Sequence, residues 1–381
     1  MLLTAPKFSR RTALSLLAAA SLNQPSFALG VENTSFIFIL LRGGMDGLSA
    51  LIPQDKATRS LRQKLLPDPS KLYDLHNGFA LHPSFKSLHS FYKKGNASFI
   101  HASSTAYRAR SHFDAQDFLE ILGNNKFSDG WLNRALKAMG GSGLALARSV
   151  PLTLQGEMDV SNWSPPLFDE VSPDLLARLS TLYVNDLELA RSLESASANK
   201  VEGMSINRRS STRLNLEYPI ALEALGRIMS AKGGPGVGMV ALNGWDTHIN
   251  QQGQLERKFQ QLDDGLLALK TQLGKKWDQT CIVVCSEFGR TAAINGTRGT
   301  DHGTGGLVML VGGAVAGGQV KGNWPGLKKK ELYQGRDLAP ANDITAVLKG
   351  VLRDHLGIDR STLDRSIFPG SARAFDGLIK S

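Results

Sequence analysis

The sequence contains too few cysteines to depend on covalent cross-links. Only two of its 381 residues are cysteine, Cys281 and Cys285. They flank an apolar, β-branched segment that predicts a buried strand. At ~3.3 Å per residue, two positions four apart on a strand are ~13 Å apart, which is too far for a disulfide. We therefore expect two buried thiols and a fold stabilised by its core.

Long apolar runs and clusters of basic residues are also missing. No segment after the N-terminal region approaches the ~20 apolar residues that a membrane-spanning helix needs, so we expect no stable span. The 44 basic residues outnumber the 34 acidic ones, for a net charge of +10. They are scattered, and no nucleic-acid-binding motif is present, so we expect no nucleic-acid partner. The charge balance is compatible with anionic substrates or an anionic envelope surface.

The first 28 residues have the features of an export signal. Arg10 and Arg11 precede a short apolar segment at 13–22. Ser26 and Ala28 then supply the small residues of a cleavage site, with cleavage expected after Ala28. This pattern predicts a twin-arginine signal peptide over 1–28. The alternative, a membrane anchor, is disfavoured because the apolar run is too short. We expect a periplasmic or secreted protein that meets the twin-arginine translocase during export, a route that carries folded cargo with any metal already loaded.

The remaining residues, 29–381, predict a single α/β domain. Strand-like apolar segments occur at 35–41, 96–101, 236–242, 282–284 and 307–311. A helical pattern at 251–273 joins two of them, and strand, helix, strand in this order indicates a parallel crossover. We expect a mostly parallel central sheet with helices on both faces. Residues 150–235 are more polar and predict a mainly helical insertion, with helices at 174–204 and 211–232.

Polar residues follow several of the predicted strands. These residues are Asp46, Asp246, His248, Glu287, Arg290, Asp301 and His302. In open α/β sheets the ligand site lies beyond the carboxyl ends of the strands, and an Asp and a His two positions apart at a strand end can share a metal ion. The glycine-rich segment around Asp46 has two interpretations: a tight turn into a helix, or a site for an anion or a metal.

Ser111 also has two interpretations. A helix is expected to begin near this residue, and Asp114 three positions later completes the pattern of a capping box. Alternatively, a serine at a helix N-terminus beside Arg108 and Arg110 is placed to attack or bind an anion. The two roles are compatible, because a capping position can also present its hydroxyl to a ligand.

Five segments together resemble a known family. They are LRGGMDGL at 41–48, SHFDAQDF at 111–118, WDTH at 245–248, CSEFGR at 285–290 and GTDHGTGG at 299–306. In this order they are similar to the domain of unknown function 1501 family, exported bacterial proteins of the alkaline phosphatase-like superfamily, which includes the sulfatases. The resemblance runs from about residue 35 to about residue 356. It implies an alkaline phosphatase-like fold and a metal-assisted hydrolase.

The resemblance also implies roles for individual residues. One or two divalent ions (Zn²⁺, Mg²⁺ or Ca²⁺) would be held by residues from the set Asp46, Asp246, His248, Glu287, Asp301 and His302. We expect Asp246, His248 and His302 to converge on one ion. Ser111 would be the nucleophile, with His112 as an alternative attacking group, and Arg110 or Arg290 would neutralise developing charge. Phe288 stands where relatives carry a ligand histidine, so a second ion would keep at most two oxygen ligands, or its site would be empty.

Three functions are compatible with these residues. The first is hydrolysis of an anionic phosphate or sulfate ester, with the charge of the reacting group stabilised by a metal ion and arginine. The second is a non-catalytic relative that binds a polymer, a lipid head group or a partner protein. In the third, His302 and Asp246 are merely hydrogen-bonded core residues. A fold alone does not choose among them.

Export gives the first testable prediction. Replacing Arg10 and Arg11 together by lysine should leave the precursor in the cytoplasm, because the twin-arginine pathway reads the paired arginines. Cell fractionation and immunoblotting measure the outcome. Normal periplasmic accumulation of the double variant would mean that the protein uses another route.

Overall fold

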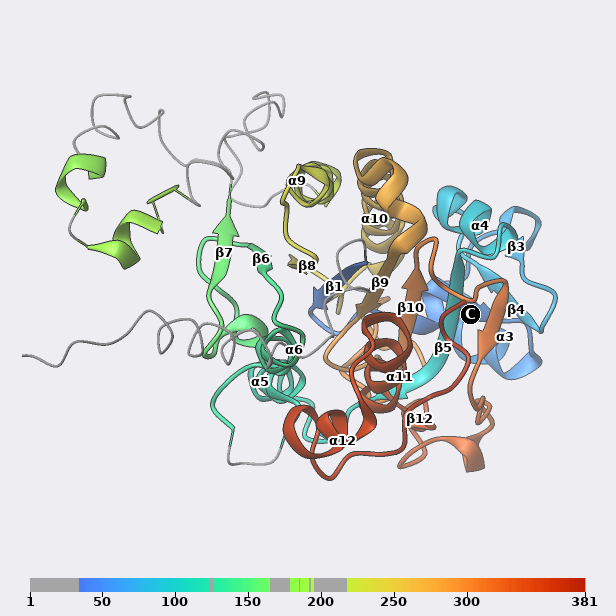
Figure 1. Cartoon of the computed structure of the whole chain (residues 1–381). Coiled ribbons are helices and arrows are strands. Elements are labelled where there is room, and N and C mark those ends of the chain that lie inside the picture. Colours follow the sequence, from blue (N-terminus) through green and yellow to red (C-terminus); the bar gives the residue numbers. More distant parts are fainter. Residues whose placement is uncertain are drawn as a thin grey trace, which may run out of the picture.

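The computed structural model describes residues 34–123, 127–164, 179–184, 186–191, 193–194 and 218–380. The predicted signal peptide lies outside these residues, as does part of the predicted insertion, 165–178, 185, 192 and 195–217. The main sheet has nine strands in the order β11-β5-β10-β9-β1-β8-β6-β7, and β12 also pairs with β5 (Figure 1). Its strands are β1 (Ser35–Arg42), β5 (Ala97–Ser104), β6 (Gly143–Leu146), β7 (Val160–Trp163), β8 (Val237–Asn243), β9 (Thr280–Cys285), β10 (Gly306–Val311), β11 (Gln319–Lys321) and β12 (Asn342–Asp343).

Strand β1 lies in the middle of this sheet. It pairs in parallel with β8 on one side and β9 on the other, with Phe38 opposite both Met239 and Val283. Among the described strands of this main sheet only β10 runs antiparallel, against both β5 and β9. Because β1 is covered on both faces, its sequence is continuously apolar instead of alternating.

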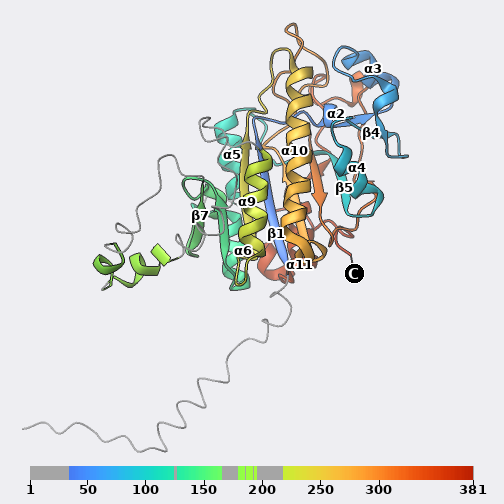
Figure 2. The same cartoon turned by 90° about the horizontal axis from the view of Figure 1, so that it is seen from above.

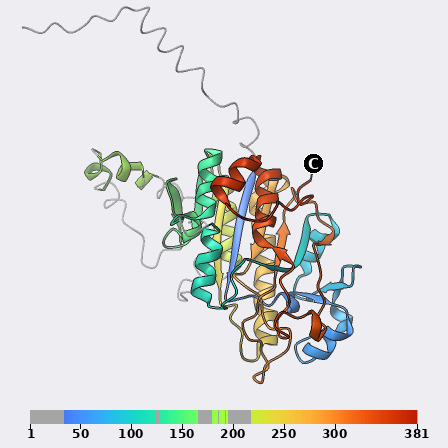
Figure 3. The same cartoon turned by 90° about the horizontal axis from the view of Figure 1, so that it is seen from below.

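Helices cover both faces of the sheet. The side chains of successive β1 residues point to opposite faces, so Ile37 and Ile39 belong to one core cluster and Phe36 and Phe38 to the other. The first cluster includes α4 (Lys86–Lys93), α9 (Tyr218–Ser230) and α10 (Gln251–Leu273), of which α9 and α10 lie in front of β1 in Figure 2. The second includes α5 (His112–Ile121), α6 (Trp131–Met139) and α11 (Ile344–Leu356), the teal and red helices of Figure 3.

The predicted fold class is confirmed: the protein is α/β with a largely parallel central sheet. The five predicted strands correspond to β1, β5, β8, β9 and β10, and the helix predicted at 251–273 is α10. Both cysteines are buried and free. No helix among the described residues is long and apolar enough to cross a membrane. The single-domain division stays a prediction; within the predicted insertion, β7 joins the main sheet and α9 packs on α10.

A second, smaller sheet was not predicted. It consists of β2 (Leu51–Pro53), β4 (Phe79–Leu81) and β3 (Tyr73–Asp74) in that order. Short helices α2 (Gly47–Ala50) and α3 (Lys56–Arg62) lie beside it in sequence, and α12 (Arg360–Thr362) follows α11. Strands of two or three residues carry too little periodicity to be recognised from sequence.

Candidate metal centre

The polar segments singled out in the sequence meet at one edge of the main sheet. The loops after β8 and β9 leave from the carboxyl ends of these parallel strands. The segment that carries His302 enters β10, which is antiparallel to β9 and therefore starts at the same edge. The connection that follows β5 also reaches this edge, and α5 begins there at His112. The ligand position typical of α/β sheets is thus where these side chains lie.

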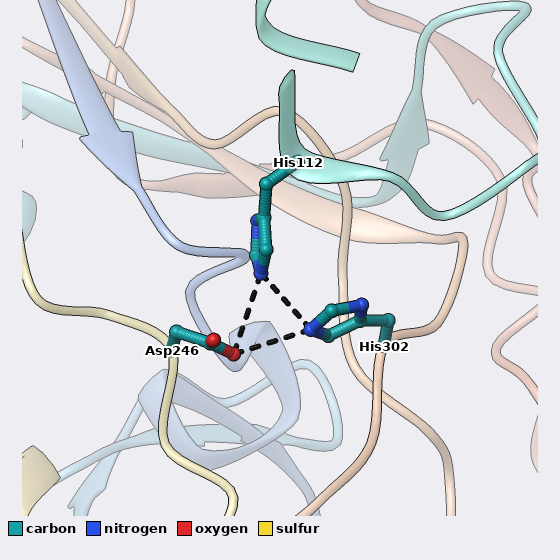
Figure 4. Close-up of side chains that lie close together, drawn as sticks. All are labelled: His112, Asp246 and His302. Carbon is teal, nitrogen blue, oxygen red and sulfur yellow. Dashed lines mark hydrogen bonds and ion pairs between the residues drawn. The ribbon is translucent and has the colours of Figure 1, made fainter. Parts of the chain in front are cut away.

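Three side chains form a compact group at this edge (Figure 4). The Nε2 atom of His302 is 2.9 Å from Nε2 of His112 and 3.2 Å from Oδ1 of Asp246. The same Asp246 oxygen is 3.4 Å from Nε2 of His112. His112, Asp246 and His302 offer one ligand atom each within 4.8 Å of one another, so the three could hold a metal ion.

His248 lies against two members of this group, although it is not among the three residues whose ligand atoms all lie within 4.8 Å of one another. Its Nε2 is 3.0 Å from Nε2 of His302 and 2.9 Å from Oδ1 of Asp246. The structure therefore brings together the three residues that we expected to share an ion, Asp246, His248 and His302. It adds His112, which the sequence had suggested only as a reacting group.

The protonation states of these histidines leave lone pairs facing one another. Nδ1 of His302 is 3.0 Å from the backbone oxygen of Arg110, which can only accept, so this nitrogen carries the proton. Nδ1 of His112 is 2.7 Å from a carboxylate oxygen of Glu287 and is the donor for the same reason. Neutral His112 and His302 then present unprotonated Nε2 atoms to each other and to Asp246. Such a cluster of acceptors requires a shared proton or a cation.

Glu287 is the orienting partner of His112. It is almost fully buried, and Oε1 accepts hydrogen bonds from the Gly43 amide, His112 and Gln116. Burial alone would raise the pKa of Glu287, but the bonds from His112 and Gln116 lower it below the usual value. Burial likewise opposes protonation of His112, yet its contact with Glu287 raises the pKa of His112. Glu287, predicted as a metal ligand, is therefore a carboxylate behind a ligand histidine, an arrangement common at metal centres.

Asp301 lies in a similar place behind His248. Its Oδ1 is 3.6 Å from Nδ1 of His248 and accepts a bond from Asn295. The hydrogen bond from Asn295 is the main reason that the pKa of Asp301 is lowered. The predicted ligand Asp301 thus contacts the outer nitrogen of His248, and Nε2 of that histidine is the atom turned toward His302.

Arg290 holds Asp246 in place. Its buried guanidinium donates to Oδ1 of Asp246 at 2.6 Å and to the backbone oxygens of Gly44 and Trp245. Burial would raise the pKa of Asp246, but the bond and charge of Arg290 lower it to about 2. Asp246 is therefore a carboxylate at any ordinary pH. The prediction that Arg290 meets a substrate is wrong, because its side chain is fully buried and occupied by the protein.

Arg110 is also occupied. Its Nε and Nη2 atoms both donate to Oδ2 of the buried Asp337, at 2.9 and 2.8 Å, and Nη2 also donates to Gln334. What this residue contributes to the site is its backbone oxygen, which contacts His302. Asp337 also accepts from Arg336, so one carboxylate serves two guanidiniums, and the charge-neutralising role of Arg110 stays a prediction.

Asp46 is part of a separate buried network. Its Oδ2 accepts from Arg62, Ser49 and Gln251, and both Asp46 and Arg62 are fully buried. Its Oδ1 is buried without a hydrogen-bond partner among the described residues. The cation next to Asp46 in this structure is the guanidinium of Arg62, and the alternatives for a second site, two oxygen ligands or none, stay a prediction.

Phe288 packs against the candidate ligands. Its ring centroid is 4.7 Å from that of His112 and 5.2 Å from that of His302. A side chain at Gly44 would clash with the same ring, since a Cβ there would lie 2.6 Å from Cε2 of Phe288. Phe288 therefore fills the space beside the two imidazoles and restricts their rotation.

Ser111 is the N-cap residue of α5, but it makes no capping hydrogen bond with its side chain. The predicted capping box is wrong because Tyr107 takes its place. The Tyr107 hydroxyl accepts from the Ser111 amide at 3.3 Å and donates to Asp114 at 3.2 Å. The Ser111 hydroxyl is thus not used as a cap in this structure.

The donor atoms around Nε2 of His302 suit a transition metal. Bonds of 2.0–2.1 Å in a tetrahedral zinc site put ligand atoms roughly 3.3 Å apart, and the separations here are 2.9 Å for His112–His302, 3.0 Å for His248–His302 and 3.2 Å for Asp246–His302. Imidazole nitrogen is a good ligand for Zn²⁺, Cu²⁺, Fe²⁺ and Ni²⁺, whereas Mg²⁺ and Ca²⁺ prefer oxygen. The residues present therefore fit an ion of the first kind.

Comparison with protein families identifies the chain. Residues 101–367 match the family described as "Protein of unknown function (DUF1501)". The chain belongs to the DUF1501 family. In this DUF1501 protein the match begins at residue 101, so β1 and Asp46 precede it, whereas we expected the resemblance to start near residue 35. A search of curated proteins gives no significant match.

Solved structures similar to this DUF1501 protein are only distantly related. The C-terminal periplasmic domain of EcEptC from Escherichia coli is 9% identical with a TM-score of 0.40, over 92% of this chain and 90% of that one. Lipoteichoic acid synthase LtaP from Listeria monocytogenes is 7% identical with a TM-score of 0.41, over 91% and 78%. Human ectonucleotide pyrophosphatase/phosphodiesterase 5 is 10% identical with a TM-score of 0.34, over 67% and 57%. We base no functional argument on likenesses this distant.

The buried pair of Asp46 and Arg62 gives a prediction. Replacing Asp46 by asparagine should lower the free energy of unfolding by about 3 kcal/mol, because it leaves a buried guanidinium unpaired. Bound metal per folded chain should not change. Denaturant titration and metal analysis of the same preparation measure both quantities. Loss of metal with little loss of stability would instead make Asp46 a ligand.

The contact between Glu287 and His112 gives a second prediction. Replacing Glu287 by glutamine should weaken metal binding about 10- to 100-fold, because the imidazole loses the carboxylate that fixes its tautomer. Competition with a chelating dye measures the affinity. Asp301→Asn is the matched control, and its effect should be smaller because its 3.6 Å contact with His248 is longer and half-exposed. Equal affinities of the Glu287→Gln and wild-type proteins would contradict this role.

Proposed function

We propose that the protein is an exported, metal-dependent hydrolase of anionic phosphate or sulfate esters. The observation that carries this proposal is the convergence of Nε2 of His112, His248 and His302 with Oδ1 of Asp246. These four residues would hold one ion, and zinc suits three imidazoles and a carboxylate best. When bound, the ion supplies a Lewis acid that polarises an ester oxygen.

The protein's own groups organise this centre. Glu287, the Arg110 backbone oxygen and Asp301 bind the outer nitrogens of the three histidines. Arg290 keeps Asp246 ionised. Because these contacts already hold the candidate ligands in position, the ligands would not have to reorganise during the reaction.

Ser111 is the proposed nucleophile. It precedes His112 directly, and its hydroxyl is not used to cap α5. Its oxygen would form a bond to phosphorus or sulfur while the bond to the alcohol oxygen breaks. The hydroxyl proton passes to solvent, and the departing alkoxide takes a proton from solvent. Water would then release the phosphate or sulfate and restore the serine.

The anionic substrate rests on the family resemblance and on the net charge of +10. Because Arg110 and Arg290 are both paired with carboxylates, this occupancy favours a second candidate, a non-catalytic protein that binds an envelope ligand or partner. Metal analysis of the purified protein, with assays of p-nitrophenyl phosphate and p-nitrophenyl sulfate, separates the two. Bound metal without turnover of either ester would favour the second candidate.

Ser111 gives the prediction that tests the reaction itself. Because its side chain makes no capping bond, Ser111→Ala should change the free energy of unfolding by less than about 0.5 kcal/mol. Turnover should nevertheless be lost, with bound metal unchanged. Ser111→Asp should also be inactive, since a negative charge would repel an anionic substrate. Retained turnover in the folded alanine variant would make water the attacking group.

A further inference from the structure

Two loops that carry candidate ligands are in direct backbone contact. Asp246 follows β8 and His302 precedes β10, so the two side chains approach each other from separate segments of the chain (Figure 4). The segments touch closely, because a Cβ at Gly299 would lie 2.1 Å from the backbone oxygen of His248. The separation of the ligands therefore depends on what holds the two loops together.

One buried side chain binds both loops. Gln251 is the first residue of α10, and its Oε1 accepts from the hydroxyl of Thr247 at 3.1 Å and from that of Thr300 at 2.6 Å. Thr247 directly follows Asp246. Thr300 is two positions before His302. Since Gln251 and both threonines are buried, these bonds are shielded from water.

The orientation of the Gln251 amide is fixed at its other end. Its Nε2 donates to Oδ2 of Asp46, and a carboxylate can only accept, so Oε1 is the atom that faces the two threonines. Both threonines must then donate, because an amide oxygen has no proton to give. Asp46 is itself held by Arg62 and Ser49. Each group thus has one role, and the hydrogen bonds define a single arrangement of the loops.

We infer that Gln251 is a positioning residue of the candidate metal centre: by holding both threonines on one amide oxygen, it sets the separation of Asp246 and His302. Its described hydrogen bonds reach the two threonines and Asp46, not the imidazoles or Asp246, so it acts through the loops. A residue that only supported the start of α10 would affect stability and leave the metal geometry unchanged. This inference rests on the metal centre of the proposed function.

Removing one hydroxyl tests the inference with little change in volume. Thr300→Val keeps the size of the side chain but cannot donate to Gln251. We expect the affinity for Zn²⁺ to fall about 10-fold, the lower end of the range for groups that orient metal ligands. We also expect the visible absorption of bound Co²⁺ to change, because its d–d bands depend on coordination geometry. Thr300→Ser keeps the hydroxyl and should restore both wild-type values.

Thr280→Val is the matched control. The Thr280 hydroxyl is also buried and donates to the backbone oxygen of Lys276 at 2.7 Å, but Thr280 begins β9, at the edge of the sheet opposite to the centre. Both valine variants should lose about 1 kcal/mol of unfolding free energy. Only Thr300→Val should alter the Zn²⁺ affinity, measured with a chelating dye, and the Co²⁺ spectrum. Equal effects on metal binding in the two variants would contradict the inference.

Gln251→Met tests the central residue itself. Methionine has a similar length but can neither accept from the threonines nor donate to Asp46, so this variant should reproduce the metal-binding effects of Thr300→Val. A folded Gln251→Met protein with wild-type Zn²⁺ affinity and Co²⁺ spectrum would overturn the inference. Should the methionine variant fail to fold, Thr300→Val decides the question, because it removes one bond of the same network.

The outcomes also separate this inference from the hydrolase proposal. Zn²⁺ binding that weakens in Thr300→Val, without turnover of p-nitrophenyl phosphate or sulfate by wild type, would refute the hydrolase and keep the positioning role. Turnover by wild type, with metal binding unchanged in Thr300→Val and Gln251→Met, would do the reverse. A wild-type protein that binds neither Zn²⁺ nor Co²⁺ would overturn both.

Discussion

Arg290 connects the loops on which the candidate centre depends. Its guanidinium donates to the backbone oxygens of Gly43 and Gly44 after β1, Trp245 after β8, and Thr300 before β10. It also binds the side chain of Asp246. Only a planar guanidinium with five donors can satisfy this many acceptors at fixed angles. Without Arg290 these loops would bury unpaired carbonyl groups. The position of the candidate ligand Asp246 therefore depends on the same guanidinium that stabilises the loops.

The glycine-rich turn after β1 illustrates how the site uses its own groups. Such turns can direct backbone amides toward an anion, and here that anion is the protein's own carboxylate, Glu287. The Gly43 amide donates to Glu287, and the Met45 amide donates to the Ser286 hydroxyl. The turn thereby fixes the carboxylate that orients His112. Amides that could have bound a substrate phosphate instead support a ligand.

The departures from the pattern that the family resemblance implied are consistent with one another. Phe288 removes an imidazole and packs against His112 and His302. Asp46 binds Arg62, whose Nη1 is also held by the backbone oxygens of Thr291 and Ala292. The Arg62 guanidinium thus occupies the carboxylate of Asp46, and the Phe288 ring fills space beside the histidines. A second ion would need both that carboxylate and that space. We therefore interpret the centre as one for a single ion.

The sequence alone determined the α/β class, because β1, β8 and β9 are continuous apolar runs and α10 has clear helical periodicity. It also placed Asp246 and His248 at the carboxyl edge of the sheet, because they follow a buried strand of a parallel sheet, while the family resemblance implied that His302 joins them. Tertiary structure decided the rest. Whether Glu287 binds a metal or a histidine depends on α5, whose His112 and Gln116 contact it from 175 and 171 positions away. Local patterns carry no information on such pairings, because the side chains meet only when the sheet and its helices have packed.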